Sequence, residues 1–246
     1  MQANPDKFQA IILGNSNTDE ISFEIDGHKI KPTNCVKLLG VKIDNKLSFT
    51  EHISTICSKA ALQLNALGRL SKSLSSDTKY LIFNSFILSN FNYCPLVWHQ
   101  CSLDSIRKIE KIQERGLRLV LQDKVSSYND LLQKSKRNFL YVERIKKLAL
   151  FVYKCVNTCG PPLNHDLYDK KQIHYDLRDP YRLNQPKVNT TTFGLNSLKY
   201  SGAALWNQMP IELKQCVELS DFQRLLKIWD GPQCSCGICN QCKIKT

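Results

Sequence analysis

The hydrophobic pattern of this chain changes its period once, near residue 47. Before that point apolar and polar residues alternate, which is typical of β-strands with one buried face. After it apolar residues recur every three or four positions, which is typical of amphipathic helices. The change of period predicts an α+β fold that is mostly α. A small antiparallel sheet at residues 1–46 should precede a helical bundle at residues 47–159.

Four short strands are expected in the N-terminal part, at residues 8–13, 21–25, 28–31 and 36–43. Asp26-Gly27 lies between the second and the third, and Asp-Gly between alternating segments strongly favours a β-hairpin. The second strand should therefore pair with the third. Gly40 interrupts the last strand at a position where a β-bulge is plausible.

Residues that cap helix N-termini precede most of the expected helices. Ser48 and Glu51 have the spacing of a capping box, and a short helix is expected after the cap at Ser127 and Asp130. The helices of the bundle should start near Ser48, Ser75, Ser102, Ser127 and Tyr141, and the last should continue to Asn157.

Gly160-Pro161-Pro162 ends the helical pattern, because proline cannot continue a helix. A polar connector is expected at residues 160–195, as extended chain with short strands or with partial disorder. Residues 196–232 should be helical again, with a last helix that begins at the capping box Ser220 to Gln223. Residues 233–246 are a cysteine-rich tail.

Positive charge is concentrated in the bundle. The 246 residues include 34 Lys and Arg and 22 Asp and Glu, and residues 51–160 hold 17 of the basic and 8 of the acidic ones. A basic surface confined to one region is the electrostatic footprint of a polyanion. It favours a nucleic-acid partner, an RNA–DNA or DNA duplex, over the alternative of a solvated lysine-rich surface.

The first group of candidate nucleic-acid contacts lies on the third expected helix. Arg107, Lys111 and Arg115 recur at intervals of four, where like charges repel unless an anion lies along the helix. Two glutamates lie beside them, and Glu114 can pair with Arg118. A solvated face of mixed charge therefore explains the same pattern.

The second group is denser and has few acidic neighbours. It consists of Arg137, Arg144, Lys146 and Lys147, with Lys134 and Lys136 just upstream. The aromatic residues interleaved with these cations are Tyr128, Phe139 and Tyr141. Aromatic rings among cations can stack on bases or sugars, so a phosphate-binding surface is the favoured interpretation of this group.

The cysteines fall into two classes. Those in or beside apolar stretches should be reduced core thiols, namely Cys35, Cys57, Cys94, Cys101, Cys155 and Cys159. The tail instead carries Cys234, Cys236, Cys239 and Cys242. Four thiolates suit a tetrahedral Zn²⁺ site, but the two pairs nearly abut. A single tight zinc site, a site shared between chains and a redox-sensitive tail without metal are all open.

The sequence contains no recognisable catalytic motif. It has no adjacent aspartates, no Gly-x-Ser-x-Gly, no Walker A sequence and no His-Glu-x-x-His. No segment reaches the roughly 18 apolar residues of a membrane-spanning helix, and the N-terminus does not resemble a secretory signal. We therefore expect no membrane partner and an intracellular protein, cytoplasmic or nuclear, that is not secreted.

Six segments stand out when they are taken together in chain order. They are Asn4-Pro-Asp-Lys7, Lys37-Leu-Leu-Gly-Val-Lys-Ile-Asp44, Leu47-Ser-Phe-Thr-Glu-His52, Tyr93-Cys-Pro-Leu-Val-Trp98, Ile109-Glu-Lys-Ile-Gln-Glu-Arg115 and Ala204-Leu-Trp-Asn-Gln-Met-Pro210. In order and spacing they resemble the distal palm, thumb and C-terminal extension of non-LTR retrotransposon reverse transcriptases of the jockey-like branch. The resemblance covers nearly the whole chain.

The resemblance implies that residues 1–46 are a remnant of the palm and that residues 47–159 are a thumb, which follows the minor groove of the template–primer duplex. It implies that Lys7 lies near the phosphates of the incoming nucleotide, and that Leu38, Leu39 and Gly40 grip the primer end. The family's metal-binding carboxylates would lie upstream of Asn4. The resemblance therefore describes a truncated C-terminal segment that holds no Mg²⁺ and does not itself catalyse RNA-directed DNA synthesis.

Three functions are compatible with these observations. The first is a catalytically inactive polymerase segment that retains affinity for nucleic acid. The second is a protein-interaction module, helical or dependent on zinc. The third is a non-functional translated relic whose strands lack their neighbours.

Overall fold

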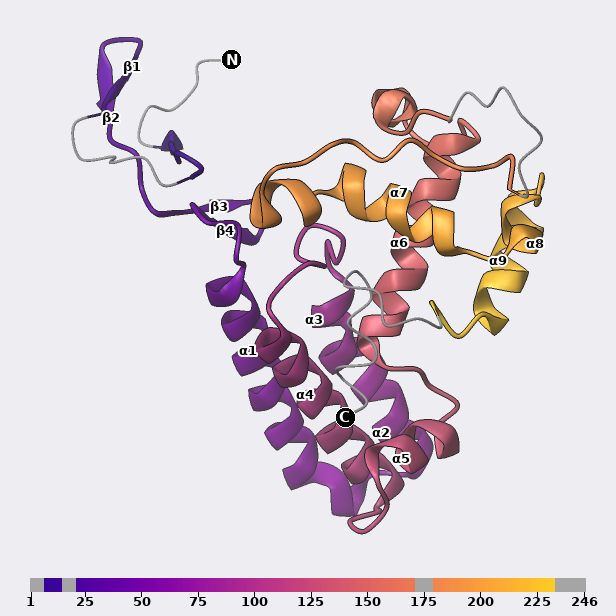
Figure 1. Cartoon of the computed structure of the whole chain (residues 1–246). Helices are drawn as coiled ribbons and strands as arrows, with labels where there is room; N and C mark the ends of the chain where they lie inside the picture. The colour runs from indigo at the N-terminus through magenta and orange to yellow at the C-terminus, as the bar shows by residue number, and fades with distance from the viewer. Residues whose placement is uncertain (1–6, 15–20, 171–178, 233–246) are drawn as a thin grey trace.

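The computed structural model describes residues 7–14, 21–170 and 179–232, and the fold is α+β and mostly α, as predicted. Two small antiparallel hairpins at the N-terminus precede the helices (Figure 1). In the first hairpin, β1 (Phe23–Ile25) pairs with β2 (His28–Ile30). Asp26 and Gly27 have φ values of 49° and 79°, as a two-residue turn of this kind requires. The predicted pairing is confirmed.

The prediction of one strand at residues 36–43 is wrong, because this segment forms a second hairpin. β3 (Cys35–Leu38) pairs with β4 (Val41–Asp44), and the chain reverses at Leu39 and Gly40 with φ values of 46° and 86°. Two successive positive φ values are the conformation of a tight hairpin turn, so Gly40 is a turn residue rather than a bulge.

The predicted strand at residues 8–13 does not form. This segment makes isolated backbone bonds to the second hairpin instead of a ladder. Thr33 N–H donates to the Ala10 carbonyl at 2.8 Å, and Gly14 N–H donates to the Asn45 carbonyl at 3.0 Å. The chain therefore lies along the hairpin without extending its sheet.

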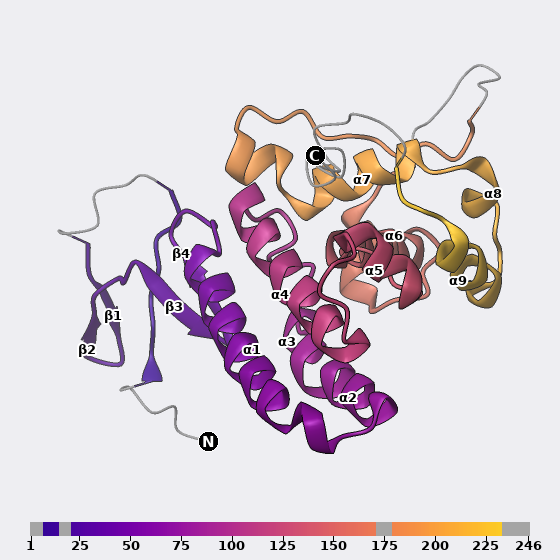
Figure 2. The same ribbon diagram turned by 90° about the horizontal axis from the view of Figure 1, so that it is seen from below.

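The predicted helices of the bundle are confirmed. They are α1 (Thr50–Leu70), α2 (Ser76–Ile82), the π-helix η3 (Phe83–Leu88), α3 (Ser89–Asn92), α4 (Leu103–Leu121), α5 (Tyr128–Lys134) and α6 (Leu140–Val156), with a 3-10 turn η2 (Ser71–Ser73) after α1. The side chains of Ser75, Ser102 and Ser127 accept backbone hydrogen bonds at the starts of α2, α4 and α5. Figure 2 shows α1 and α4 side by side.

The capping box predicted at Ser48 does not form. The Asp44 carboxylate organises this turn instead, because it accepts the backbone N–H groups of Ser48 and Phe49 at 3.0 and 2.6 Å. Glu51 points elsewhere and pairs with Lys42 at 2.7 Å. The start of α1 is therefore fixed by the hairpin that precedes it.

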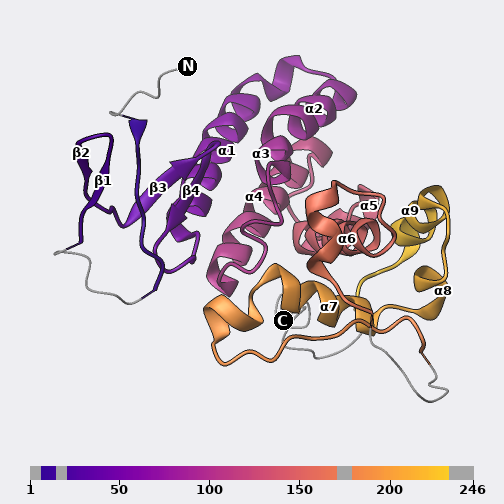
Figure 3. The same ribbon diagram turned by 90° about the horizontal axis from the view of Figure 1, so that it is seen from above.

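The remaining elements form a C-terminal layer that contacts α6 and, through residues 192–193, also reaches Phe49 and Leu96 of the bundle. They are η4 (Pro162–Leu167), η5 (Thr191–Leu195), α7 (Leu198–Gln208), α8 (Ile211–Lys214) and α9 (Leu219–Ile228). α9 begins one residue before the predicted cap, and no side chain caps it. In the connector, the described residues form one isolated β-bridge, between Lys170 and Leu183. Figure 3 shows α6 between the bundle and this C-terminal layer.

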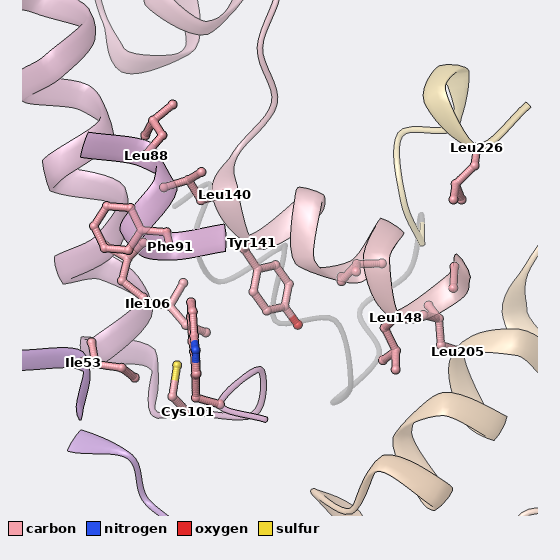
Figure 4. Packing of buried hydrophobic residues seen from close by; sticks show 14 of the residues in the cluster. Ile53, Leu88, Phe91, Cys101, Ile106, Leu140, Tyr141, Leu148, Leu205 and Leu226 are labelled. Carbon is pink, nitrogen blue, oxygen red and sulfur yellow. The ribbon is translucent and has the colours of Figure 1, made fainter. Parts of the chain in front are cut away.

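One hydrophobic core runs through both layers. Figure 4 shows it from Ile53 on α1 and Ile106 on α4, past Tyr141 and Leu148 on α6, to Leu205 on α7. The seven described cysteines are free, and Cys57, Cys101 and Cys155 are buried as predicted. Cys159 is exposed, so its assignment to the core is wrong. None of the described helices combines the length and the apolarity that crossing a bilayer requires.

Candidate nucleic-acid interface

A cavity of about 1200 Å³ lies where α1 and α4 end and α2 begins. The two long helices run in the same direction, since Asn65 lies beside Arg115, and Gly68 lies beside Leu119 about one turn farther along each helix. Both therefore end at the side of the bundle away from β3 and β4 (Figure 1). The segment η2, which links α1 to α2, forms part of the cavity wall.

Six cations line this cavity, and no acidic residue is among the described residues that line it. The cations are Arg69, Lys72, Lys79, Arg115, Arg118 and Lys124. The C-terminal ends of α1 and α4 carry partial negative charge, which stabilises cations in their last turns. The remaining repulsion among the six favours an anion in the cavity. We call the exposed members Arg69, Lys72, Arg115 and Lys124 the rim cations.

Two of the six are held in position by neighbours. Arg115 Nη2 donates to Asn65 Oδ1 at 3.3 Å. Arg118 is half-buried, with Nη2 at 2.7 Å from Glu114 Oε1 and Nη1 at 2.9 Å from the Ser126 carbonyl. The predicted pairing of Arg118 with Glu114 is therefore confirmed, and it neutralises the carboxylate nearest to the cavity.

Lys79 differs from the other five because it is almost completely buried. Its side chain is 2% exposed. Its backbone N–H donates to the Ser75 carbonyl at 3.0 Å, but its Nζ has neither a hydrogen bond nor an ion pair to another residue that the structure describes. Nζ is not among the buried atoms that lack a partner, so it remains accessible from the cavity. An ammonium group that is reached only through the cavity and has no protein partner favours an anion or water beside it.

The structure separates the first predicted group of contacts. Arg107, Lys111 and Arg115 are all exposed on α4, but only Arg115 reaches the cavity. Arg107 instead lies 3.5 Å from Asp104. The predicted column of charge is thus a solvated face along most of its length, and Arg115 and Arg118 are its contribution to the site.

The structure contradicts two assignments in the second group. Arg144 is 2% exposed and lies over the rings of Trp98 and Tyr141, 5.0 and 5.5 Å from their centroids. Lys146 is 8% exposed and donates to the Lys227 carbonyl at 2.8 Å. Both are covered because α6 packs on the bundle with one face and on α9 with another. These two residues therefore belong to the core and its margin rather than to a phosphate-binding surface.

Arg137 and Lys147 of the second group are engaged by protein partners. Arg137 is half-buried, lies 5.2 Å from the centroid of the Tyr80 ring and donates to the Tyr80 hydroxyl and to Asn84. Lys147 donates to Asn92 Oδ1 at 2.7 Å. None of them lines the cavity.

The aromatic residues predicted to stack on bases are also occupied. Tyr141 is buried, and Phe139 packs edge-on against Tyr128 with ring centroids 5.3 Å apart. The Tyr128 hydroxyl donates to Glu110 at 2.7 Å. Glu110 is buried in turn, and burial raises the pKa of its carboxyl. These rings stabilise the junction of α4, α5 and α6.

The residues assigned by resemblance lie away from the cavity. Lys7 is exposed at the start of the described chain. Leu38 and Leu39 form the exposed tip of the second hairpin, where the Tyr93 hydroxyl donates to the Leu39 carbonyl at 2.5 Å. Gly40 lies under the Tyr93 ring, where a Cβ atom would be 3.6 Å from Cε1. This contact fixes the hairpin tip against the segment that follows α3.

The cysteine tail lies outside the described residues, so zinc binding by Cys234, Cys236, Cys239 and Cys242 stays a prediction. Within the described ranges no group of three His, Cys, Asp or Glu side chains is arranged to hold a metal ion.

Four of the six cations in the cavity were not among the nucleic-acid contacts predicted from the sequence. Asn65 and Arg69 lie one turn apart on one face of α1, and Lys72 follows three residues later in η2, so this spacing could have identified two of them. Lys79 and Lys124 come from other elements. No spacing in the sequence brings them to α1, because the packing of α1 on α4 creates the site.

No protein-family model matches this chain, and neither a curated protein nor a solved structure is similar enough to it to count as a match.

Proposed function

We propose that this chain is the palm–thumb segment of a jockey-like non-LTR retrotransposon reverse transcriptase and that its helical bundle binds a nucleic-acid duplex through the basic cavity. The observation that carries the proposal is the convergence of six cations on one cavity without an acidic lining residue among those described. The ordered motif resemblance supports the same assignment.

The proposed contacts are to phosphates rather than to bases. The rim cations are exposed, and arginine and lysine at such positions bind the backbone without reading the sequence. A polyanion in the cavity would also relieve the repulsion among the six charges. Binding should therefore be insensitive to sequence and sensitive to salt.

The proposal includes no catalytic step on these residues. The 246 residues contain no adjacent aspartates, and two-metal nucleotide transfer needs carboxylates that hold two ions. By themselves, these residues would therefore bind a template–primer without extending it and would hold no Mg²⁺. A cytoplasmic or nuclear location is part of the same proposal.

The test compares two variants that lose the same charge. One carries Arg69→Gln, Lys72→Met, Arg115→Gln and Lys124→Met at the rim. The control carries Arg182→Gln, Lys187→Met, Lys199→Met and Arg224→Gln, which change exposed cations of the C-terminal part. Fluorescence anisotropy with a labelled RNA–DNA duplex at low salt gives the affinities.

We expect the rim variant to lose at least about tenfold in affinity and the control to stay within about threefold of the wild type. Equal losses in both variants would show that net charge alone drives binding, and the cavity would then have no specific role.

A further inference from the structure

We propose that Lys79 receives a terminal phosphate of a nucleic-acid strand, so that the cavity distinguishes a phosphorylated strand end from a backbone that runs past it. This inference rests on the proposed function, because it assigns a ligand class to one residue of the same cavity. The inference depends on the difference in burial between Lys79 and the exposed rim cations.

The six cations differ in how accessible they are from outside the cavity. The rim cations are exposed, whereas Lys79 is 2% exposed and can be reached only by a group that enters the cavity. The phosphates of a continuous duplex lie along its outer surface, with a base pair behind each of them. Such a backbone can contact the rim, but only the end of a strand can project a phosphate inward.

A terminal phosphate and a backbone phosphate also differ in charge. A phosphate monoester at a strand end carries roughly −1.5 to −2 at neutral pH and offers three acceptor oxygens. A backbone diester carries a single negative charge. Lys79 Nζ lacks a partner among the described residues, and half-buried Arg118 lines the same cavity. An ammonium group without a protein partner, reached only through a cavity lined by cations, favours the more highly charged monoester.

The lysine side chain is also chemically suited to bind a terminal phosphate. An ammonium group is a compact point charge with three donors, and such a group suits phosphate oxygens that arrive from several directions. Arg115, one of the two exposed arginines of the rim, instead donates to Asn65 Oδ1 at 3.3 Å. Lys79 therefore combines an adaptable donor with a position that only a group inside the cavity can reach.

The experiment uses three RNA–DNA duplexes of one sequence, which end in a 5′-phosphate, a 3′-phosphate or only hydroxyl groups. Affinities are measured by fluorescence anisotropy for the wild type, Lys79→Met and the matched control Lys59→Met. Lys59 is exposed on α1 and does not line the cavity. Circular dichroism and a thermal unfolding curve confirm that each variant is folded.

We expect the wild type and Lys59→Met to bind one phosphorylated end about tenfold more tightly than the hydroxyl end. Lys79→Met should lose this preference and keep the affinity for the hydroxyl end. Equal affinities for all three ends in the wild type, or a preference that survives in Lys79→Met, would overturn the inference. Tight binding without preference would leave the proposed function intact, whereas no binding of any duplex would remove both.

A competition experiment on the wild type does not depend on how any variant folds. Inorganic phosphate should displace the phosphorylated duplex at lower concentration than it displaces the hydroxyl duplex at equal ionic strength. Identical displacement curves would mean that water, rather than a phosphate monoester, solvates Lys79.

Discussion

His99 shows how strongly burial acts on a single residue in this chain. It is 3% exposed and stacks on Tyr141 with ring centroids 5.5 Å apart. Burial, with a smaller contribution from the nearby Arg144 charge, lowers the pKa of His99 to about 3. The unfolded chain therefore binds a proton below about pH 6.5 that the folded chain does not bind. The contribution of neutral His99 to the free energy of unfolding is therefore fully present above pH 6.5 and is lost as the pH falls toward 3.

We predict that His99→Gln removes part of this acid sensitivity. For the wild type, this one group should lower the free energy of unfolding by about 1.4 kcal/mol per pH unit between about pH 6 and 4. Urea unfolding across that range should give a smaller slope for the variant. Burial also lowers the pKa of His52, so some dependence should persist. Equal slopes would contradict the assignment. Above pH 7, where His99 is neutral in the folded and in the unfolded chain, the free energy of unfolding should change with pH in the same way for both proteins.

Leu39 occupies a conformation that suits asparagine or glycine better. Its φ is 46°, and the side chain is 82% exposed at the hairpin tip. We predict that Leu39→Asn raises the free energy of unfolding by about 1 kcal/mol, because it relieves left-handed strain and uncovers little apolar surface. Tyr93 bonds to the backbone carbonyl of this residue, so that contact should survive. A decrease measured in urea would mean that the leucine side chain has a stabilising contact of its own.

At the scale of elements, the sequence was informative where structure is local. Ser75, Ser102 and Ser127 mark helix starts because a cap depends on residues within one turn. The sequence did not predict features that depend on how two elements pack together. The Asp44 carboxylate takes the place of the predicted cap of α1, and Arg144 is covered because its own helix, α6, packs on two layers. A pattern of cations on one helix does not reveal a second layer above it.

A very close contact between elements joins α4 to η3. A Cβ atom on Gly116 would lie 2.0 Å from Phe83 Cε2, and the Phe83 ring is fully buried. We predict that Gly116→Ala lowers the free energy of unfolding by about 2 kcal/mol or more, although alanine normally stabilises a helix by up to about 1 kcal/mol.

Gly68→Ala is the matched control on α1. There a Cβ atom would meet the tip of the Leu119 side chain at 3.2 Å, which can move aside. We expect a change between zero and a gain of about 1 kcal/mol in urea unfolding. A similar loss in both variants would show that the α4–η3 contact is not specially tight.

At the scale of the whole molecule, the site depends on helix packing that joins distant parts of the sequence. The excess of basic residues at 51–160 could be counted from the sequence, and it indicated the right region. The count did not indicate which cations line the cavity. In the denser second group, Arg137, Lys147 and Lys146 form hydrogen bonds with Tyr80, Asn92 and the C-terminal layer. The cavity exists because α1 and α4 end together and α2 begins beside them.

The most direct test of duplex binding by the cavity is the salt dependence of the wild type. Affinity for an RNA–DNA duplex is measured by fluorescence anisotropy at several salt concentrations, and the logarithm of the association constant is plotted against the logarithm of the salt concentration. Four rim cations that each neutralise a phosphate predict a slope of about −4, and the rim variant should give a slope near zero. A wild-type slope near zero, or no binding at low salt, would contradict the account.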